Sequence, residues 1–270
     1  GGAGTLAVSK DSSSPAYTTA AVGSSGTTGI TLGVLRFDGT NEDMRLDRIA
    51  LVMSNGSASS SPNNITQVTI WDGATQVGSA IFAGARFATS TLTSTVTIPA
   101  NGSKSLTLKG DLAGISLNSA GTAGSLIQVD YDNDDSTGTR AIGMSSGSTI
   151  NRTSSADTAM AGVRTQRSVP SITYAATAGN LVNGTNPLLQ VTVTADAKGD
   201  VKLNKLTFAT STTAAVLASP TFTGPNGSVG TVTTSGTAIT ITFDSVSNTS
   251  DSVVTAGTSK VYTLGATVSG

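Results

Sequence analysis

The chain has 270 residues and contains neither cysteine nor histidine. Their absence excludes disulfide bonds, thiolate nucleophiles, histidine general bases and the common zinc sites built from these two residue types. Aromatic residues make up only 4% of the chain. Ring platforms for sugars are therefore scarce, and a pair of glycosidase carboxylates would lack an aromatic cleft around it. We predict that the protein is not an enzyme.

Charge is also sparse, because charged residues make up 11% of the chain and the formal net charge is −1. A chain without a basic face or run is not expected to bind nucleic acid. No apolar run approaches the roughly 20 residues that a helix needs to cross a bilayer, so direct membrane insertion is not expected either. The chain begins with Gly1-Gly2 instead of Met, which suggests a processed form or a fragment.

The abundant residues favour strands and turns. Thr and Val favour strands, whereas the 31 glycines and the many Ser, Asn and Asp residues favour turns. Low net charge and repeated apolar alternation argue against disorder. The sequence therefore predicts an all-β protein. The expected strands are Thr5–Ser9, Ile30–Phe37, Met44–Met53, Ile65–Trp71, Thr75–Phe82, Ser90–Ile98, Ser105–Leu112, Ser125–Tyr131, Ser171–Ala175, Leu188–Ala195, Val201–Thr210, Ser228–Thr233, Ala238–Phe243 and Lys260–Val268.

One irregular pattern occurs twice. MRLDRIAL (44–51) and VKLNKLTF (201–208) each contain two apolar pairs with a spacing of two, and two polar residues put the second pair out of phase. Such a slip predicts a β-bulge, or a strand that crosses from one sheet to another. Because the slip is shared, we interpret the two stretches as copies of one unit.

The copies extend over most of two predicted modules, residues 1–140 and 168–270. VTIPANGSKSLTLKG (96–110) matches VVTAGTSKVYTLG (253–265). Seven or eight short strands with regular turn signals predict two tandem immunoglobulin-like β-sandwich modules, with a closed barrel as the alternative. The Ser/Thr/Gly-rich residues 141–167 between them are predicted to be a linker or a packing segment, with at most weak helix at Ala156–Val163.

Several stretches resemble a known type of protein. Ser168-Val169-Pro170 with VTVTADAKGDVKLNKLTF (191–208), and TNEDMRLDRIAL (40–51) with IWDGATQVG (70–78), resemble tandem immunoglobulin-like β-sandwich repeats of large bacterial cell-surface proteins. The resemblance covers most of both modules and implies an extracellular S-layer-like array, sheath or stalk. It implies no catalytic residues.

The densest polar cluster is VDYDNDDSTG (129–138). Its oxygen-bearing side chains are Asp130, Asp132, Asn133, Asp134 and Asp135. Calcium accepts six to eight oxygen ligands in flexible geometry, so this spacing predicts a calcium site, although the EF-hand pattern is missing. The alternative is a solvated acidic turn. A weaker acidic group consists of Asp38, Asn41, Glu42 and Asp43.

Seven Asn-x-Ser/Thr triplets are candidate glycosylation sites, and most fall in predicted turns. Unmodified turn residues are the alternative reading. The candidate residues are Asn55, Asn64, Asn101, Asn151, Asn183, Asn226 and Asn248.

These observations predict a non-enzymatic structural protein of the cell exterior, part of a surface layer, sheath or filament. Self-association is expected through exposed strand edges and through the ends Gly1–Leu6 and Gly265–Gly270. Cell-envelope glycans are candidate partners, and no cofactor other than calcium is expected. One alternative is an adhesin or stalk spacer that presents a binding domain outside the chain. The other is a carbohydrate-binding accessory module that uses Trp71 or Tyr131, although Trp71 is expected to support a core.

Overall fold

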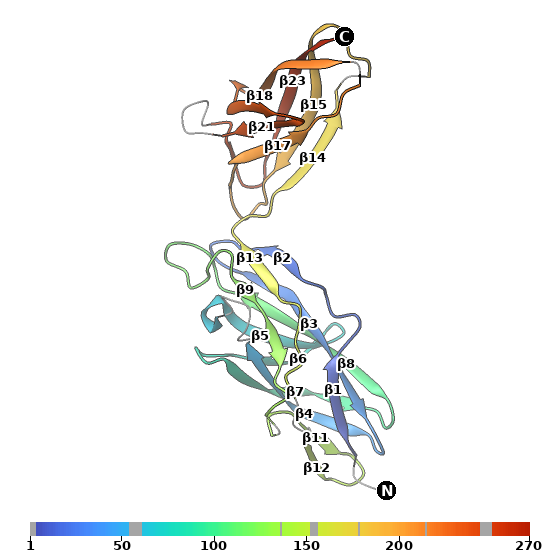
Figure 1. Ribbon diagram of the computed structural model, residues 1–270. Helices are drawn as coiled ribbons and strands as arrows, with labels where there is room; N and C mark the ends of the chain where they lie inside the picture. The colour runs from blue at the N-terminus through green and yellow to red at the C-terminus, as the bar shows by residue number, and fades with distance from the viewer. Residues whose placement is uncertain are drawn as a thin grey trace. The chain divides into compact units, whose positions relative to one another are not determined.

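The computed structural model describes residues 4–53, 61–135, 137–151, 156–177, 179–213, 215–243 and 250–270. These residues form strands, turns and one short 3-10 helix, η1 (Pro62–Asn64), so the all-β prediction is confirmed. No helix among them is long and apolar enough to cross a membrane. The chain divides into two compact units, Gly1–Arg167 and Ser168–Gly270 (Figure 1).

The first unit contains a five-stranded sheet in the order β1-β3-β8-β5-β6 and a second sheet in the order β10-β4-β11-β12, in which β7 also pairs with β4. Three short strands, β2-β13-β9, form a further sheet. The strands are β1 (Leu6–Lys10), β2 (Thr18–Ala21), β3 (Thr27–Gly39), β4 (Met44–Met53), β5 (Ile65–Asp72), β6 (Thr75–Ala80), β7 (Phe87–Ile98), β8 (Ser103–Leu112), β9 (Leu126–Ile127), β10 (Val129–Tyr131), β11 (Arg140–Gly143), β12 (Thr149–Asn151) and β13 (Val163–Gln166).

The core of the first unit lies between its two main sheets. Alternate residues of each strand point inward, as expected for a half-buried strand. Leu35 of β3 and Leu106 of β8 are opposite each other and fully buried, and Leu46 and Ile49 of β4 belong to the same apolar cluster. Trp71 lies next to the inward-facing Ile70 and is only half-buried, so the prediction that it supports the core is wrong.

The second unit contains a five-stranded sheet in the order β14-β15-β23-β18-β19, a three-stranded sheet in the order β17-β21-β20, and the pair β16-β22. Its own apolar cluster includes stacked Phe222 and Tyr262, with ring centroids 5.5 Å apart. The strands are β14 (Ser171–Ala176), β15 (Gly184–Thr194), β16 (Val201–Lys202), β17 (Lys205–Ala209), β18 (Val216–Gly224), β19 (Gly227–Ser228), β20 (Thr231–Ser235), β21 (Ala238–Thr242), β22 (Val253–Val254) and β23 (Ser259–Ser269).

The large sheets of the two units have the same strand order and the same register. β1-β3-β8-β5-β6 corresponds to β14-β15-β23-β18-β19. Leu35 is opposite Leu106 in the first unit, and Val191 is opposite Tyr262 in the second. The match continues on the other side of the central strand, where the corresponding pairs are Ile70 with Leu108 and Phe222 with Leu264.

The repeated slip coincides with an irregularity in both units. In β4 the pairing with β7 shifts between Leu46 and Arg48, which is a bulge at Asp47. In the second unit the strand is interrupted after Lys202, and its two halves, β16 and β17, pair with β22 and β21. β21 and β22 together therefore correspond to the long strand β7.

The strand order within each unit is set by the position of its final long strand. β8 and β23 lie in the middle of the larger sheet, between the strands that precede and follow the slip. An immunoglobulin domain instead orders its strands A-B-E-D in one sheet and C-F-G in the other. Each unit is thus a sandwich-like β module with its own strand order.

Residues 141–167 are part of the first unit. They contribute β12, β13 and most of β11, and β11 pairs with β4 while β13 pairs with β2 and β9. The weak helix expected at Ala156–Val163 is wrong, because its described residues are loop and strand. β18 was not predicted because Pro220 interrupts its pattern; a bulge with Ser219 at positive φ accommodates this proline.

Candidate functional site

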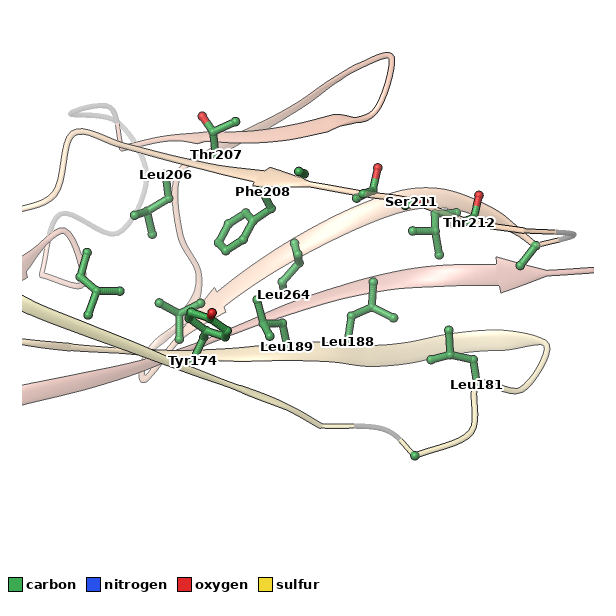
Figure 2. A pocket seen from close by; sticks show the side chains of 17 residues that line it. Tyr174, Leu181, Leu188, Leu189, Leu206, Thr207, Phe208, Ser211, Thr212 and Leu264 are labelled. Carbon is green, nitrogen blue, oxygen red and sulfur yellow. The ribbon is translucent and has the colours of Figure 1, made fainter.

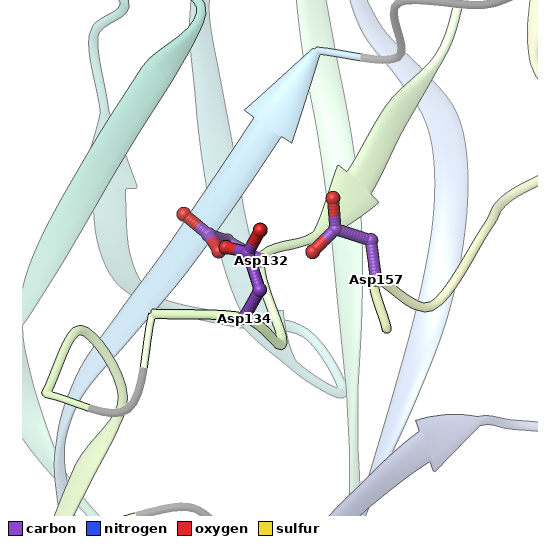
Figure 3. Close-up of side chains that lie close together, drawn as sticks. All are labelled: Asp132, Asp134 and Asp157. Atoms are coloured by element: carbon purple, nitrogen blue, oxygen red, sulfur yellow. The ribbon is translucent and has the colours of Figure 1, made fainter. Parts of the chain in front are cut away.

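The structure brings together two members of the predicted acidic cluster and one residue from a distant part of the chain. Asp132 and Asp134 follow β10, and Asp157 lies in the segment that leads to β13. One carboxylate oxygen from each residue lies within 4.8 Å of the others. Figure 3 shows the three side chains converging. We call these three residues the acidic triad.

Electrostatics in the acidic triad oppose full ionisation. Burial, the side-chain hydrogen bond with Asp134, and repulsion from Asp134 and Asp157 raise the pKa of Asp132 to about 6. Burial also raises the pKa of Asp130, although hydrogen bonds from the backbone N of Met160 and the side chain of Gln128 oppose this. A cation at the triad would relieve the repulsion and restore the ionised form.

The other predicted ligands have different roles. Asp130 Oδ1 accepts a hydrogen bond from Met160 N at 2.8 Å. Asp135 Oδ1 turns to Thr137 and accepts from its N at 3.0 Å and its Oγ1 at 3.0 Å. These bonds hold the pKa of Asp135 below its usual value.

Asn133 connects the predicted cluster to the segment that carries Asp157. Its backbone N donates to Asp157 Oδ1 at 3.0 Å, and its Nδ2 donates to the carbonyl of Ala156 at 3.0 Å. Its Oδ1 is buried and has no hydrogen-bond partner among the described residues. Asn133 therefore positions Asp157, whereas the sequence prediction made it a metal ligand.

A cavity of about 310 Å³ lies beside the acidic triad. Asp134 and Asp157 line it together with Asp130 and the guanidinium-bearing Arg86, which also donates to the carbonyl of Met53. Oxygen ligands of this kind suit a hard cation such as Ca²⁺, which would need further oxygens from backbone or water. The triad can hold such an ion, and calcium there stays a prediction.

Asp157 was missed by the sequence analysis. It is an isolated acid in a Ser/Ala-rich stretch, and the sequence gives no sign that the stretch returns to β10. The structural link is a β-bridge between Tyr131 and Thr158, with backbone N···O distances of 3.1 and 3.0 Å.

The weaker acidic group near residue 42 does not gather around a common point. Glu42 instead accepts hydrogen bonds from the backbone N of Gly4, Ser145 and Ser146 and from the Ser146 hydroxyl. These bonds, led by the Ser146 hydroxyl, lower the pKa of Glu42 to about 2. The carboxylate ties the start of β1 to the turn between β11 and β12.

The candidate glycosylation residues differ in accessibility. Asn64 is buried, and its Oδ1 accepts from the backbone N of Thr122 at 2.9 Å, so a glycan could not be added in the folded unit. Asn55 and Asn248 lie outside the described residues. The remaining candidates are exposed and stay predictions: Asn101, Asn151, Asn183 and Asn226.

The second unit contains an apolar groove of about 860 Å³ that the sequence analysis did not predict. It lies between β14 and β15 on one side and β17 on the other (Figure 2). Leu206 and Phe208 point into it from β17, and Tyr174 and Leu189 point into it from the opposite sheet. Such an opening in a sandwich exposes apolar side chains that normally form its core.

The corresponding place in the first unit is covered. Val8 and Ile172 occupy equivalent positions, because Val8 is opposite Phe37 and Ile172 is opposite Val193. Val8 is 6% exposed, whereas Ile172 is 50% exposed. The second sheets of the two units also differ: β10 and β11 pair with one side of β4, whereas β17 is an edge strand among the described residues.

Comparison with protein-family models and with curated proteins found no match for this chain. The groove and the acidic triad are therefore interpreted from their geometry alone.

Proposed function

We propose that the chain is a non-enzymatic structural component of the cell exterior, part of a surface layer, sheath or filament. Its β modules would contact neighbouring subunits through open sheet edges. The observation that carries this proposal is the open edge of the second unit, where β17 has a free side and β14 is exposed along its whole length. Unpaired strand edges with apolar residues are sites of strand addition.

The repeated architecture supports an assembly made of similar modules. A shared strand order and register, together with the shared slip, lead us to infer that one unit arose from the other by duplication. Modules of one kind arranged in series are typical of stalks and layers, which have a structural role and not a catalytic one.

The ends of the chain contribute less to the proposal than its strand edges do. Leu6 belongs to β1 and is buried. Residues 265–268 belong to β23, which pairs with β15 on one side and β18 on the other. Leu6 and residues 265–268 are thus already used within their own units, so we place the subunit contact at a sheet edge.

A carbohydrate-binding role has less support. Tyr131 is fully buried and cannot stack on a sugar. The ammonium group of Lys109 lies over one face of the Trp71 ring, 4.1 Å from the ring centroid. Tyr131 is thus unavailable for sugar stacking, and the half-buried Trp71 already has a cation over its ring.

Immunogold electron microscopy of the source cells tests the proposed function. We expect labelled chain on the outer surface, at a regular spacing that matches a layer or filament. Gold particles confined to the cell interior, or scattered on the surface without any periodic structure, would contradict the proposal.

A further inference from the structure

Within the described parts of the chain, no strand pairs with one side of β17, so the backbone groups on that side are unpaired. In β17 and its flanks, even-numbered residues bond to the β21 side: Phe243 N donates to Asn204 O at 2.9 Å, and Thr210 N donates to Thr237 O at 2.7 Å. Because successive residues of an antiparallel strand point their N–H and C=O groups to opposite sides, those of Lys205, Thr207 and Ala209 point to the open edge.

The apolar floor of the groove lies under the same edge. Ile172 and Tyr174 of β14 are opposite Val193 and Val191, which face the core, so they point to the inner side of the large sheet. They are nevertheless 50% and 79% exposed. Among the described residues, no strand pairs with β17 on the side that lies above β14.

The first unit shows what fills this place. Its β4 pairs with β7 on one side and with β10 and β11 on the other. Within β10, Val129 and Tyr131 are fully buried, and Tyr131 is opposite Leu51, which corresponds to Phe208 in the repeated pattern. An extended strand with alternate apolar residues thus closes the equivalent opening.

The uncharged lining of the groove suits a strand with apolar side chains. Among the described residues that line the groove, none carries a charge at neutral pH. A strand whose inward side chains are apolar can pair there without burying an unpaired charge. The hydroxyls of Thr207 and Ser211 point away from the groove, as Figure 2 shows.

We propose that the groove of the second unit accepts one free extended strand of a separate polypeptide, whose inward side chains are apolar and which pairs with β17 above β14. This inference rests on the proposed function and names the partner of its open edge, a strand from a chain other than a second copy. β14 and β17 are both edge strands among the described residues. A free strand can pair with β17 above β14, as β10 pairs with β4 in the first unit, whereas the edge strand of a folded copy carries a second packed sheet with it. Strand addition uses backbone hydrogen bonds for affinity and side-chain pockets for selection.

The test uses the full-length chain and a fluorescent synthetic peptide with the sequence of residues 125–132. Its alternate residues are the apolar Ile127, Val129 and Tyr131. Fluorescence polarisation should show saturable binding, and a peptide carrying Val129→Ser and Tyr131→Ser should bind at least roughly 10-fold more weakly, which corresponds to about 1.4 kcal/mol. Amide exchange at Thr207 and Ala209 should slow when the first peptide binds.

Matched proline variants of the chain locate the contact. Thr207→Pro removes an N–H that points to the open edge, and we expect at least roughly 10-fold weaker binding. Thr234→Pro is the control, because register and alternation place its N–H on the outer edge of β20, away from the groove. It should bind the peptide as the unaltered chain does.

Four results would overturn the proposal. One is no binding up to roughly 1 mM peptide, a concentration that detects very weak complexes. The second is equal loss of binding in both proline variants. The third is self-association of the chain that Thr207→Pro abolishes, which would assign the groove to a second copy. Binding of an apolar dye that the peptide does not displace would likewise overturn the proposal, because it would assign the groove to a small ligand. None of these results bears on the surface location that immunogold labelling tests, so the two proposals fail separately.

Discussion

The first unit is closed by its own chain, whereas the second unit, built on the same strand order, is open. Val8 and Ile172 occupy equivalent positions and differ in exposure from 6% to 50%. The extra strands β9 to β13 follow the repeated part of the first unit, and the second unit lacks counterparts among the described residues. The strands of the repeat alone thus leave an open groove in the second unit.

The comparison also shows where side-chain chemistry accumulates. The acidic triad and the Glu42 hydrogen bonds both involve the part of the chain that contains β10 to β13. The triad residues Asp132, Asp134 and Asp157 belong to it, and so do Ser145 and Ser146, which donate to Glu42. The second unit has a buried acid of its own, Asp251, which its neighbour Asn226 satisfies with hydrogen bonds at 2.8 Å. The strands that close the first unit therefore supply both buried apolar side chains and hydrogen-bonded polar groups.

The largest effect is expected from opening the first unit. Tyr131→Ala should lower its free energy of unfolding by about 3–5 kcal/mol, because a fully buried aromatic side chain of the cover is lost. Fluorescence of Trp71, the single tryptophan, reports this unit during denaturant unfolding. Tyr174→Ala in the open groove is the control and should have little effect. Equal stabilities of the Tyr131→Ala variant and the unaltered chain would show that β10 is not needed for closure.

Calcium binding at the acidic triad would sharpen the difference between the units. If the site binds calcium, the ion should stabilise the first unit by about 2.7 kcal/mol at 100-fold excess over its Kd. Chelation should then lower the melting temperature seen by Trp71. The double variant Asp132→Ala and Asp134→Ala should remove that dependence. A melting temperature that chelation leaves unchanged rules calcium out.

Without metal, the triad should make the first unit sensitive to pH. Because the pKa of Asp132 is raised from 3.8 to about 6, the folded unit binds the proton more tightly than the unfolded chain. The resulting stability is fully present below pH 3.8 and is lost as pH rises through about 6. A shift of this size corresponds to about 3 kcal/mol, and screening by solvent reduces it, so in chelator Asp132→Asn should remove roughly 1–2 kcal/mol of this dependence. Denaturant unfolding at several pH values measures it, and a pH profile that the substitution leaves unchanged would show that the pKa of Asp132 is not raised.

Most of the fold could be predicted from the sequence because alternation and turn residues are local signals. Met44–Met53 agrees with β4 at both ends, and the slip at Asp47 is a bulge as expected. Local patterns failed where pairing is distant. β13 pairs in parallel with β2, more than a hundred residues away, and neither strand has clear alternation. The expected single strand Ser125–Tyr131 is divided between β9 and β10, which pair with different partners.

The candidate sites were less accessible from the sequence. Asp132 and Asp134 were found because they are close in the sequence. The position of Asp157 depends on a β-bridge that no sequence pattern predicts. The groove was missed for a different reason. Leu206 and Phe208 have the alternation of core residues, and sequence periodicity does not reveal whether an opposing strand is present.

The smallest stability effect should distinguish the two units most directly. Val8→Thr and Ile172→Thr place a hydroxyl at equivalent positions. At Val8 the hydroxyl is buried under the cover and should cost about 1–3 kcal/mol. At Ile172 it is exposed to water and should change the free energy of unfolding by less than about 0.5 kcal/mol. Amide exchange of β8 and β23, the central strands of the two large sheets, measures each unit separately. Equal costs at both positions would mean that the groove is closed in solution, and the contrast between the units would then disappear.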